Sequence, residues 1–208
     1  MTELAAVSYL IALVYLANFF MLSLVAARDA GRSVWLLSRH VGAQRVTAAG
    51  FRISFAVALV WPALRMWTGG LGPGDPLTRL ISGWTASLAG HFLVAVGSAV
   101  ALLSQYHMGA SWRVGAAPGE LGPLVETGPF AFSRNPVFLG QAILLAGLAL
   151  VFPDLIQWGA AILGIAAMLT QVRIEEGVLR EAYGPAYAAY AARVPRWFGR
   201  VHGQRAED

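Results

Sequence analysis

The chain consists of long apolar stretches separated by short polar segments. Two of the stretches, 4–27 and 80–103, contain 24 residues each and no Asp, Glu, Lys or Arg. A helix of about 20 apolar residues crosses the hydrocarbon core of a bilayer, so both stretches are long enough to span it. Three other stretches are also mainly apolar. We therefore predict an all-α integral membrane protein with about five transmembrane helices, at 4–27, 46–67, 80–103, 136–152 and 155–172.

The other three stretches are shorter or interrupted. Within 46–67 only 12 residues separate Arg52 from Arg65, so both side chains have to extend toward the interfaces of the membrane. The last two stretches contain 17 and 18 residues and are separated by Pro153 and Asp154, a pair that breaks a helix. We expect these two stretches to form a hairpin of antiparallel helices.

Composition excludes several classes of protein. The chain is 57% hydrophobic and 12% charged, whereas soluble globular proteins contain about 25% charged residues, so an ordinary water-soluble enzyme is excluded. It has no cysteine and therefore no thiol nucleophile and no thiolate metal site. All 15 basic residues are Arg, which excludes a phosphate-loop lysine and a Schiff-base lysine.

The distribution of the arginines predicts the orientation in the membrane. Thirteen arginines fall on one side of the five predicted spans, and only Arg65 and Arg79 fall on the other. By the positive-inside rule, the amino terminus lies outside and the carboxy terminus lies in the cytoplasm. The net charge of +4 then belongs to a surface that faces anionic lipid. We find no nucleic-acid-binding motif and expect no nucleic-acid partner.

Two polar segments on the predicted cytoplasmic side concentrate the candidate chemistry. They are 104–135, which is rich in Gly and Pro, and 173–200. The predicted hairpin brings both to the same end of the molecule. We therefore divide the chain into three amino-terminal transmembrane helices, 1–104, and a catalytic half, 105–208, made of a cytoplasmic loop, the hairpin and a carboxy-terminal helical cap.

Each motif in these segments also has a purely structural interpretation. Asn135 before Pro136 is the pattern of a helix start, with Asn as N-cap. Glu176 and Arg180 have the i, i+4 spacing of an ordinary ion pair on a solvated face. The three tyrosines on one helical stripe are also typical of an interfacial aromatic belt; they are Tyr183, Tyr187 and Tyr190.

The two histidines in and near the third stretch are poor metal ligands. His91 lies in the middle of a predicted span, where a histidine is more often hydrogen-bonded in the core. His107 has no partner at metal-binding spacing. We assign no metal.

The order of the motifs is more specific than any one of them. Gly-Pro-Phe at 128–130, Arg-Asn-Pro-Val-Phe-Leu-Gly at 134–140, the hairpin, Arg-Ile-Glu-Glu at 173–176 and the Tyr-Gly-Pro-Ala-Tyr run follow one another. This arrangement resembles the isoprenylcysteine carboxyl methyltransferase and phospholipid methyltransferase superfamily of membrane methyltransferases. The resemblance covers roughly residues 105–198. It departs from the family's Arg-His-Pro-x-Tyr element at Asn135 and Phe138, where His and Tyr are commoner.

The resemblance implies an enzyme that uses S-adenosylmethionine and releases S-adenosylhomocysteine, in a site covered by the carboxy-terminal segment. It implies a lipophilic acceptor that enters from the bilayer. The catalytic residues it indicates are Arg134, Arg173, Glu175 and Glu176. The cofactor-binding residues it indicates are Leu124, Val125, Gly128, Arg134, Asn135, Phe138, Gly140, Glu176, Tyr183, Tyr187 and Tyr190.

The acceptor and the roles of the charged residues stay open at this point. An isoprenylcysteine-like carboxylate, a phospholipid amine and a small thiol or hydrophobic molecule are all possible acceptors. Arg173 and Glu176, three apart on a helix, are candidates to hold a carboxylate and the methionyl ammonium, and Glu175 or Glu176 is the candidate base for an amine. The alternatives are a non-catalytic membrane protein with the same fold and, less well supported, a transporter, because the spans lack charged residues at their midplane.

Overall fold

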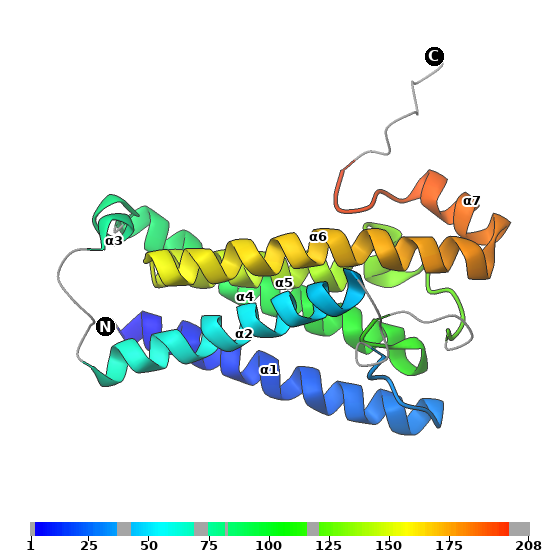
Figure 1. The fold of residues 1–208 in the computed structure, drawn as a ribbon, viewed down its shortest axis with the longest axis horizontal. Coiled ribbons are helices and arrows are strands. Elements are labelled where there is room, and N and C mark those ends of the chain that lie inside the picture. The colour runs from blue at the N-terminus through cyan, green and yellow to red at the C-terminus, as the bar shows by residue number, and fades with distance from the viewer. Residues whose placement is uncertain (1–2, 37–42, 69–74, 82, 116–120, 200–208) are drawn as a thin grey trace, which may run out of the picture.

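The computed structural model describes residues 3–36, 43–68, 75–81, 83–115 and 121–199. Within these ranges the chain is helical and contains no strand beyond an isolated bridge between Trp35 and Val114. Figure 1 shows the long helices lying side by side as one bundle, with α7 across one end. The elements are α1 (Glu3–Ala30), α2 (Ala43–Trp67), α3 (Pro76–Ile81), α4 (Trp84–Met108), η2 (Gly109–Ser111), η3 (Gly128–Ala131), α5 (Pro136–Val151), α6 (Leu155–Tyr183) and α7 (Pro185–Arg193).

The all-α membrane fold is confirmed. Four described helices, α1, α2, α4 and α6, are long and apolar enough to cross a membrane. The fifth predicted span is α5, which has 16 residues and is therefore only about 24 Å long at 1.5 Å per residue. It falls short of the length of a typical span. Its burial against neighbouring helices compensates, since nine of its residues are buried.

Two predicted boundaries were wrong. The apolar run 80–103 was predicted to form one helix, but Leu80 and Ile81 belong to α3, and α4 begins at Trp84 after the extended residue Gly83. The predicted span 155–172 was too short, because α6 continues to Tyr183. A charged residue marks where a helix leaves the apolar region, and it does not end the helix. The helix ends at Gly184, whose φ of +51° favours glycine, and Pro185 begins α7.

Glycines allow α4 and α5 to pack backbone against backbone. A β-carbon on Gly140 would lie 2.5 Å from the backbone nitrogen of Ala101, and one on Gly147 would lie 2.6 Å from that of Val94. Real β-carbons do not approach other atoms so closely. Small residues at such contacts are the usual means by which membrane helices associate. The α4–α5 contact is the most extensive between helices, followed by α2 with α6 and α1 with α4.

The predicted hairpin turn at Pro153 and Asp154 is confirmed, and it is fixed by ion pairing at that end of the bundle. Asp154 caps α6 by accepting a hydrogen bond from the backbone nitrogen of Gln157 at 2.8 Å. The same carboxylate accepts from Arg65 Nη1 at 2.6 Å and from Trp61 Nε1 at 3.0 Å. The hairpin is therefore anchored to α2 at the end opposite α7.

Candidate active site

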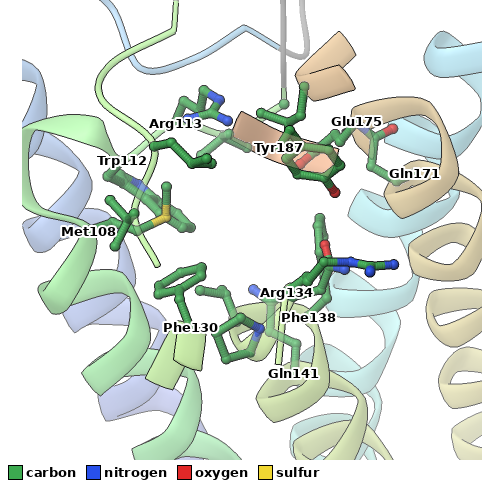
Figure 2. Close-up of a pocket in the computed structure, with 18 of the residues that line it drawn as sticks. Met108, Trp112, Arg113, Phe130, Arg134, Phe138, Gln141, Gln171, Glu175 and Tyr187 are labelled. Atoms are coloured by element: carbon green, nitrogen blue, oxygen red, sulfur yellow. The ribbon is translucent and has the colours of Figure 1, made fainter. Parts of the chain in front are cut away.

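A cavity opens at the end of the bundle where α7 lies. It contains about 1040 Å³ of empty space, including the part that is open to solvent. Its described lining comes from α1, α2, the end of α4 with residues 112–115, the segment 123–138, Gln141 of α5, α6 and α7. Figure 2 shows Met108, Trp112 and Phe130 on one side of this space and Gln171 and Glu175 on the other.

The structure brings most of the predicted site residues to this cavity. Nine of the thirteen line it: Leu124, Val125, Arg134, Asn135, Phe138, Glu175, Tyr183, Tyr187 and Tyr190. The two predicted polar segments do meet at one end of the hairpin. Their roles toward a ligand remain predictions.

The other four predicted residues lie outside the described lining. Gly140 packs against α4, and Gly128 begins η3 with φ of +59° directly beside the ring of His107. Arg173 is exposed, whereas Glu176 is buried, and neither is in the described lining; the binding roles suggested by their spacing stay predictions. Glu176 pairs with three arginines next to the cavity.

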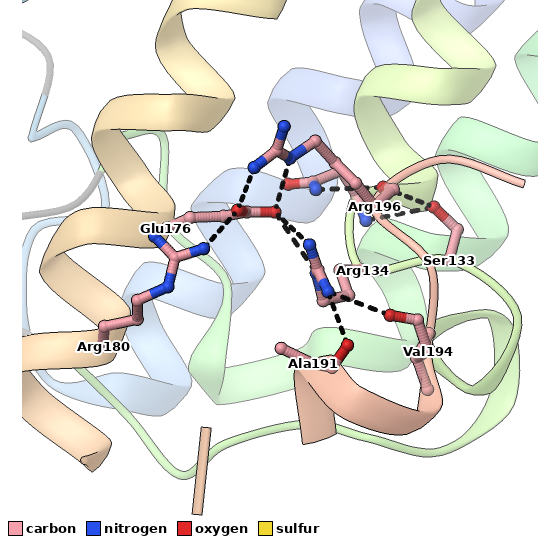
Figure 3. Close-up of polar contacts among 8 residues, drawn as sticks. Ser133, Arg134, Glu176, Arg180, Ala191, Val194 and Arg196 are labelled. Atoms are coloured by element: carbon pink, nitrogen blue, oxygen red, sulfur yellow. Dashed lines mark hydrogen bonds and ion pairs between the residues drawn. The ribbon is translucent and has the colours of Figure 1, made fainter. Parts of the chain in front are cut away.

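Glu176 accepts five hydrogen bonds from three arginines. Arg134 Nε and Nη2 donate to Oε1 at 3.2 and 3.1 Å, and Arg180 Nη2 donates to Oε2 at 3.1 Å. Arg196 donates through Nε to Oε1 at 3.0 Å and through Nη2 to Oε2 at 2.8 Å. The hydrogen bond with Glu176 raises the pKa of Arg196. We call these four residues the latch (Figure 3). The solvated-face interpretation of Glu176 was therefore wrong, because the carboxylate is only 1% exposed.

The latch joins three segments that are distant in sequence. Arg134 lies just before α5, Glu176 and Arg180 lie in α6, and Arg196 follows α7. Arg134 also donates through Nη1 to the carbonyl oxygens of Ala191 and Val194, at 2.9 and 3.0 Å. We define the cap as α7 together with residues 194–196. Arg134 therefore fixes the cap both through charge and through the backbone.

Asn135 is a second attachment point for the cap. It occupies the N-cap position of α5, but its side chain makes no capping hydrogen bond. Its Nδ2 instead donates to the carbonyl oxygen of Arg196 at 3.1 Å, beside Ser133 Oγ, which donates to the same oxygen at 3.3 Å (Figure 3). The interpretation of Asn135 as a capping residue alone was wrong. An amide is a suitable replacement for an imidazole here, because the contact needs only a hydrogen-bond donor.

Two of the three predicted tyrosines donate to the loop segment beside the cavity, and one of them, Tyr190, belongs to the cap. Tyr190 Oη donates to the carbonyl oxygen of Phe130 at 2.8 Å, and Tyr183 Oη donates to that of Gly122. Tyr187 is only 1% exposed, yet its hydroxyl has no hydrogen-bond partner among the described residues. Burial raises the pKa of Tyr187 to about 12, and the charge of Glu176 adds to this. The phenol therefore stays neutral at physiological pH.

Two charged side chains contribute opposite signs to the cavity lining. Glu175 Oε1 accepts from Gln171 Nε2 at 2.9 Å, and among the described residues no other donor contacts this carboxylate. Arg113 is also in the lining, and its Nε has no hydrogen-bond partner there. Burial lowers the pKa of Arg113, while the charge of Glu175 opposes this shift. The cavity can thus receive a ligand that carries both charges.

Several residues that line the cavity were not predicted from the sequence. Phe19 of α1 and Thr47 and Phe51 of α2 belong to the predicted amino-terminal part, so both halves of the chain form the cavity. Arg113 and Gln141 were missed because neither belongs to a motif. Gln141 could have been found, because it is a polar residue within an apolar stretch and such residues are often functional.

A comparison with known proteins finds a family for about half of the chain. A family model described as phospholipid methyltransferase matches residues 85–186, which is 102 of the 208 residues and includes α4, the loop segment, α5 and α6. A search of curated proteins found no match, and a search of solved structures found none either. The family match supports a membrane methyltransferase. Residues 85–186 are thus similar to the phospholipid methyltransferase family, which is consistent with the resemblance to the isoprenylcysteine and phospholipid methyltransferase superfamily.

Proposed function

We propose that the protein is an S-adenosylmethionine-dependent methyltransferase that acts on a lipophilic acceptor at the membrane. The observation that carries this proposal is a pair of buried polar atoms, in residues that line the cavity, without a partner among the described residues. They are Arg113 Nε and Tyr187 Oη. Leaving a buried polar group unsatisfied costs about 1–3 kcal/mol. Two such atoms in the lining of one cavity support the presence of a polar ligand.

The residues present fit the cofactor. A positively charged guanidinium at Arg113 suits the carboxylate of the methionyl group, and the carboxylate of Glu175 suits its ammonium or the sulfonium. Trp112, Phe130 and Phe138 offer aromatic surface for the adenine. When bound, S-adenosylmethionine would supply an activated methyl group and leave as S-adenosylhomocysteine.

The contribution of the protein to such a reaction is mainly positioning and exclusion of water. The cap covers the end of the cavity that faces away from the hairpin turn, while apolar residues of α1 and α2 line its other parts. Glu175 is the better candidate for a base toward an amine, because Glu176 is already saturated by three arginines. This choice between the two carboxylates was open in the sequence.

Calorimetric titration of the purified protein with S-adenosylhomocysteine tests the proposal. We expect saturable binding, and Tyr187→Phe should weaken it about tenfold by removing a cavity-facing hydroxyl. Tyr106→Phe is the matched control, since Tyr106 is 72% exposed and lies outside the cavity lining. A wild-type protein that is folded in detergent and does not bind S-adenosylhomocysteine would refute the proposed function and favour a non-catalytic member of the family.

A further inference from the structure

Gln141 lines the cavity and carries a hydrogen-bond acceptor that is unpaired among the described residues. The residue lies near the start of α5 and is 2% exposed. Its Nε2 donates to Tyr15 Oη at 2.7 Å, and its Oε1 has no partner among the described residues. Figure 2 shows Gln141 on the side of the cavity opposite Tyr187, beyond Phe138. The amide is therefore held by Tyr15 through its nitrogen, while its oxygen is unpaired among the described residues.

Tyr15 fixes the orientation of this amide. It is 2% exposed in α1, and its ring packs between Phe19 and Phe55, with centroids at 6.2 and 6.5 Å. A hydroxyl buried among aromatic rings has little freedom to move. The Tyr15–Gln141 pair is thus a rigid polar site within an otherwise apolar part of the bundle.

The position of Gln141 in the cavity points to the acceptor. The polar residues proposed to bind the cofactor, Arg113, Glu175 and Tyr187, lie toward the cap. The residues next to Gln141 in the lining, Val137 and Phe138, are apolar. α5 runs from the cavity toward the middle of the bundle, so Gln141 lies on the membrane side of Asn135.

We propose that Gln141 is a positioning residue for the methyl acceptor and that its Oε1 accepts a hydrogen bond from an N–H or O–H on the acceptor atom. This inference rests on the proposed function. It selects a lipophilic amine or alcohol over a carboxylate, because an ionised carboxylate has no hydrogen to donate and would face the oxygen of the amide. The contact orients the lone pair of the acceptor atom away from the amide.

The chemical step balances with this arrangement. The lone pair of the acceptor atom forms the new bond to the methyl carbon, and the electrons of the broken carbon–sulfur bond stay on sulfur. The acceptor atom then carries a positive charge, and its proton passes to the carboxylate of Glu175 or to water. An amine that enters as ammonium loses one proton by the same route before it reacts. Gln141 exchanges no proton and acts only on position.

Short-chain lipids with matched head groups test the inference by binding. With S-adenosylhomocysteine saturating, dioctanoylphosphatidylethanolamine offers N–H, dioctanoylphosphatidylglycerol offers O–H, and dioctanoylphosphatidylcholine offers neither. We expect wild-type protein to bind at least one of the first two about tenfold more tightly than the choline lipid. Gln141→Met should reduce this preference to within about twofold while leaving the affinity for S-adenosylhomocysteine unchanged.

Gln105→Met is the matched control. Gln105 is also 2% exposed, its Nε2 also donates to α1, at Phe19 O and Ser23 Oγ, and its Oε1 is also unpaired among the described residues, but it does not line the cavity. This variant should keep the full preference. Tyr15→Phe, which removes only the hydroxyl that holds the amide, should lose part of the preference and provides a second test if Gln141→Met does not fold.

The outcomes separate the two proposals. If wild-type protein does not bind S-adenosylhomocysteine, the proposed function fails. If it binds S-adenosylhomocysteine but does not prefer either donor lipid to the choline lipid, the inference about Gln141 fails alone. A preference that persists in both Gln141→Met and Tyr15→Phe would also overturn it.

Discussion

Substitution of Glu176 by Gln should open the cap. The carboxylate accepts five hydrogen bonds, and the change turns one oxygen into an NH2 group that faces arginine donors. Loss of one partner of a buried ion pair costs about 3–5 kcal/mol. Arg180 and Arg196 are 54% and 38% exposed and can turn toward water, so we expect a smaller cost of about 2–3 kcal/mol, at and below the lower end of that range. The open cap should become about 30- to 150-fold more populated.

Hydrogen–deuterium exchange measures this opening directly. Backbone amides of the cap, 185–196, should exchange faster in Glu176→Gln by about the same factor, while amides of α4 and α5 should not change. Glu126→Gln is the control, because Glu126 also pairs with the cap, at 2.7 Å from Arg193, but both side chains are partly exposed. Such a pair contributes under about 1 kcal/mol. Exchange of the cap in Glu176→Gln within threefold of wild type would refute the latch.

Three further predictions concern packing, pH and topology. Gly147→Ala places a β-carbon against the backbone of α4 and should lower thermal stability by about 1–3 kcal/mol, whereas Gly159→Ala, which meets open space, should not lower it. Hydrogen bonds from backbone N–H groups, the first residue of α6 foremost, lower the pKa of Asp75 below its usual value. Asp75 thus stabilises the fold above its unfolded pKa, and this contribution is lost as pH falls through the lowered folded pKa, so the melting temperature should fall less with acidification in Asp75→Asn. A reporter after Asp208 should signal cytoplasm and one within 69–74 the outside, both beyond the described residues; reversed signals would overturn the orientation.

Sequence patterns predicted the helices better than their ends. Apolar length identifies membrane helices because the bilayer excludes charge, and this physical rule correctly located α1, α2, α4 and α6. The same rule does not register helix ends, which depend on local backbone geometry. α6 therefore extended 11 residues past the predicted boundary at Val172, to Tyr183. A glycine at 184 followed by Pro185 was the available signal for the true end.

Lining residues that belong to a contiguous sequence motif were predicted. Lining residues that reach the cavity only through the packing of separate helices were missed. Arg134 and Asn135 belong to one short motif at the start of the hairpin. The hairpin returns the chain to the same end of the bundle, so their proximity to the acidic pair of α6 could be predicted. Gln141 and Phe19 reach the cavity only through the packing of α5 and α1. When a helix is apolar on every face, its sequence does not indicate which face packs against a neighbouring helix. A single sequence therefore identifies the charged end of the cavity more readily than its apolar end.

The two adjacent carboxylates of α6 point in different directions and make different contacts. Successive residues of a helix point about 100° apart, given 3.6 residues per turn. Glu175 consequently lines the cavity, where a carboxylate with a single described donor can interact with a ligand, while Glu176 points into the latch. Exchanging the roles would require a rotation of α6 that also displaces Gln171 from Thr47, to which it is hydrogen-bonded at 2.8 Å. The contact between α2 and α6 thus sets the register of the pair: it directs Glu175 toward the cavity and Glu176 toward the latch.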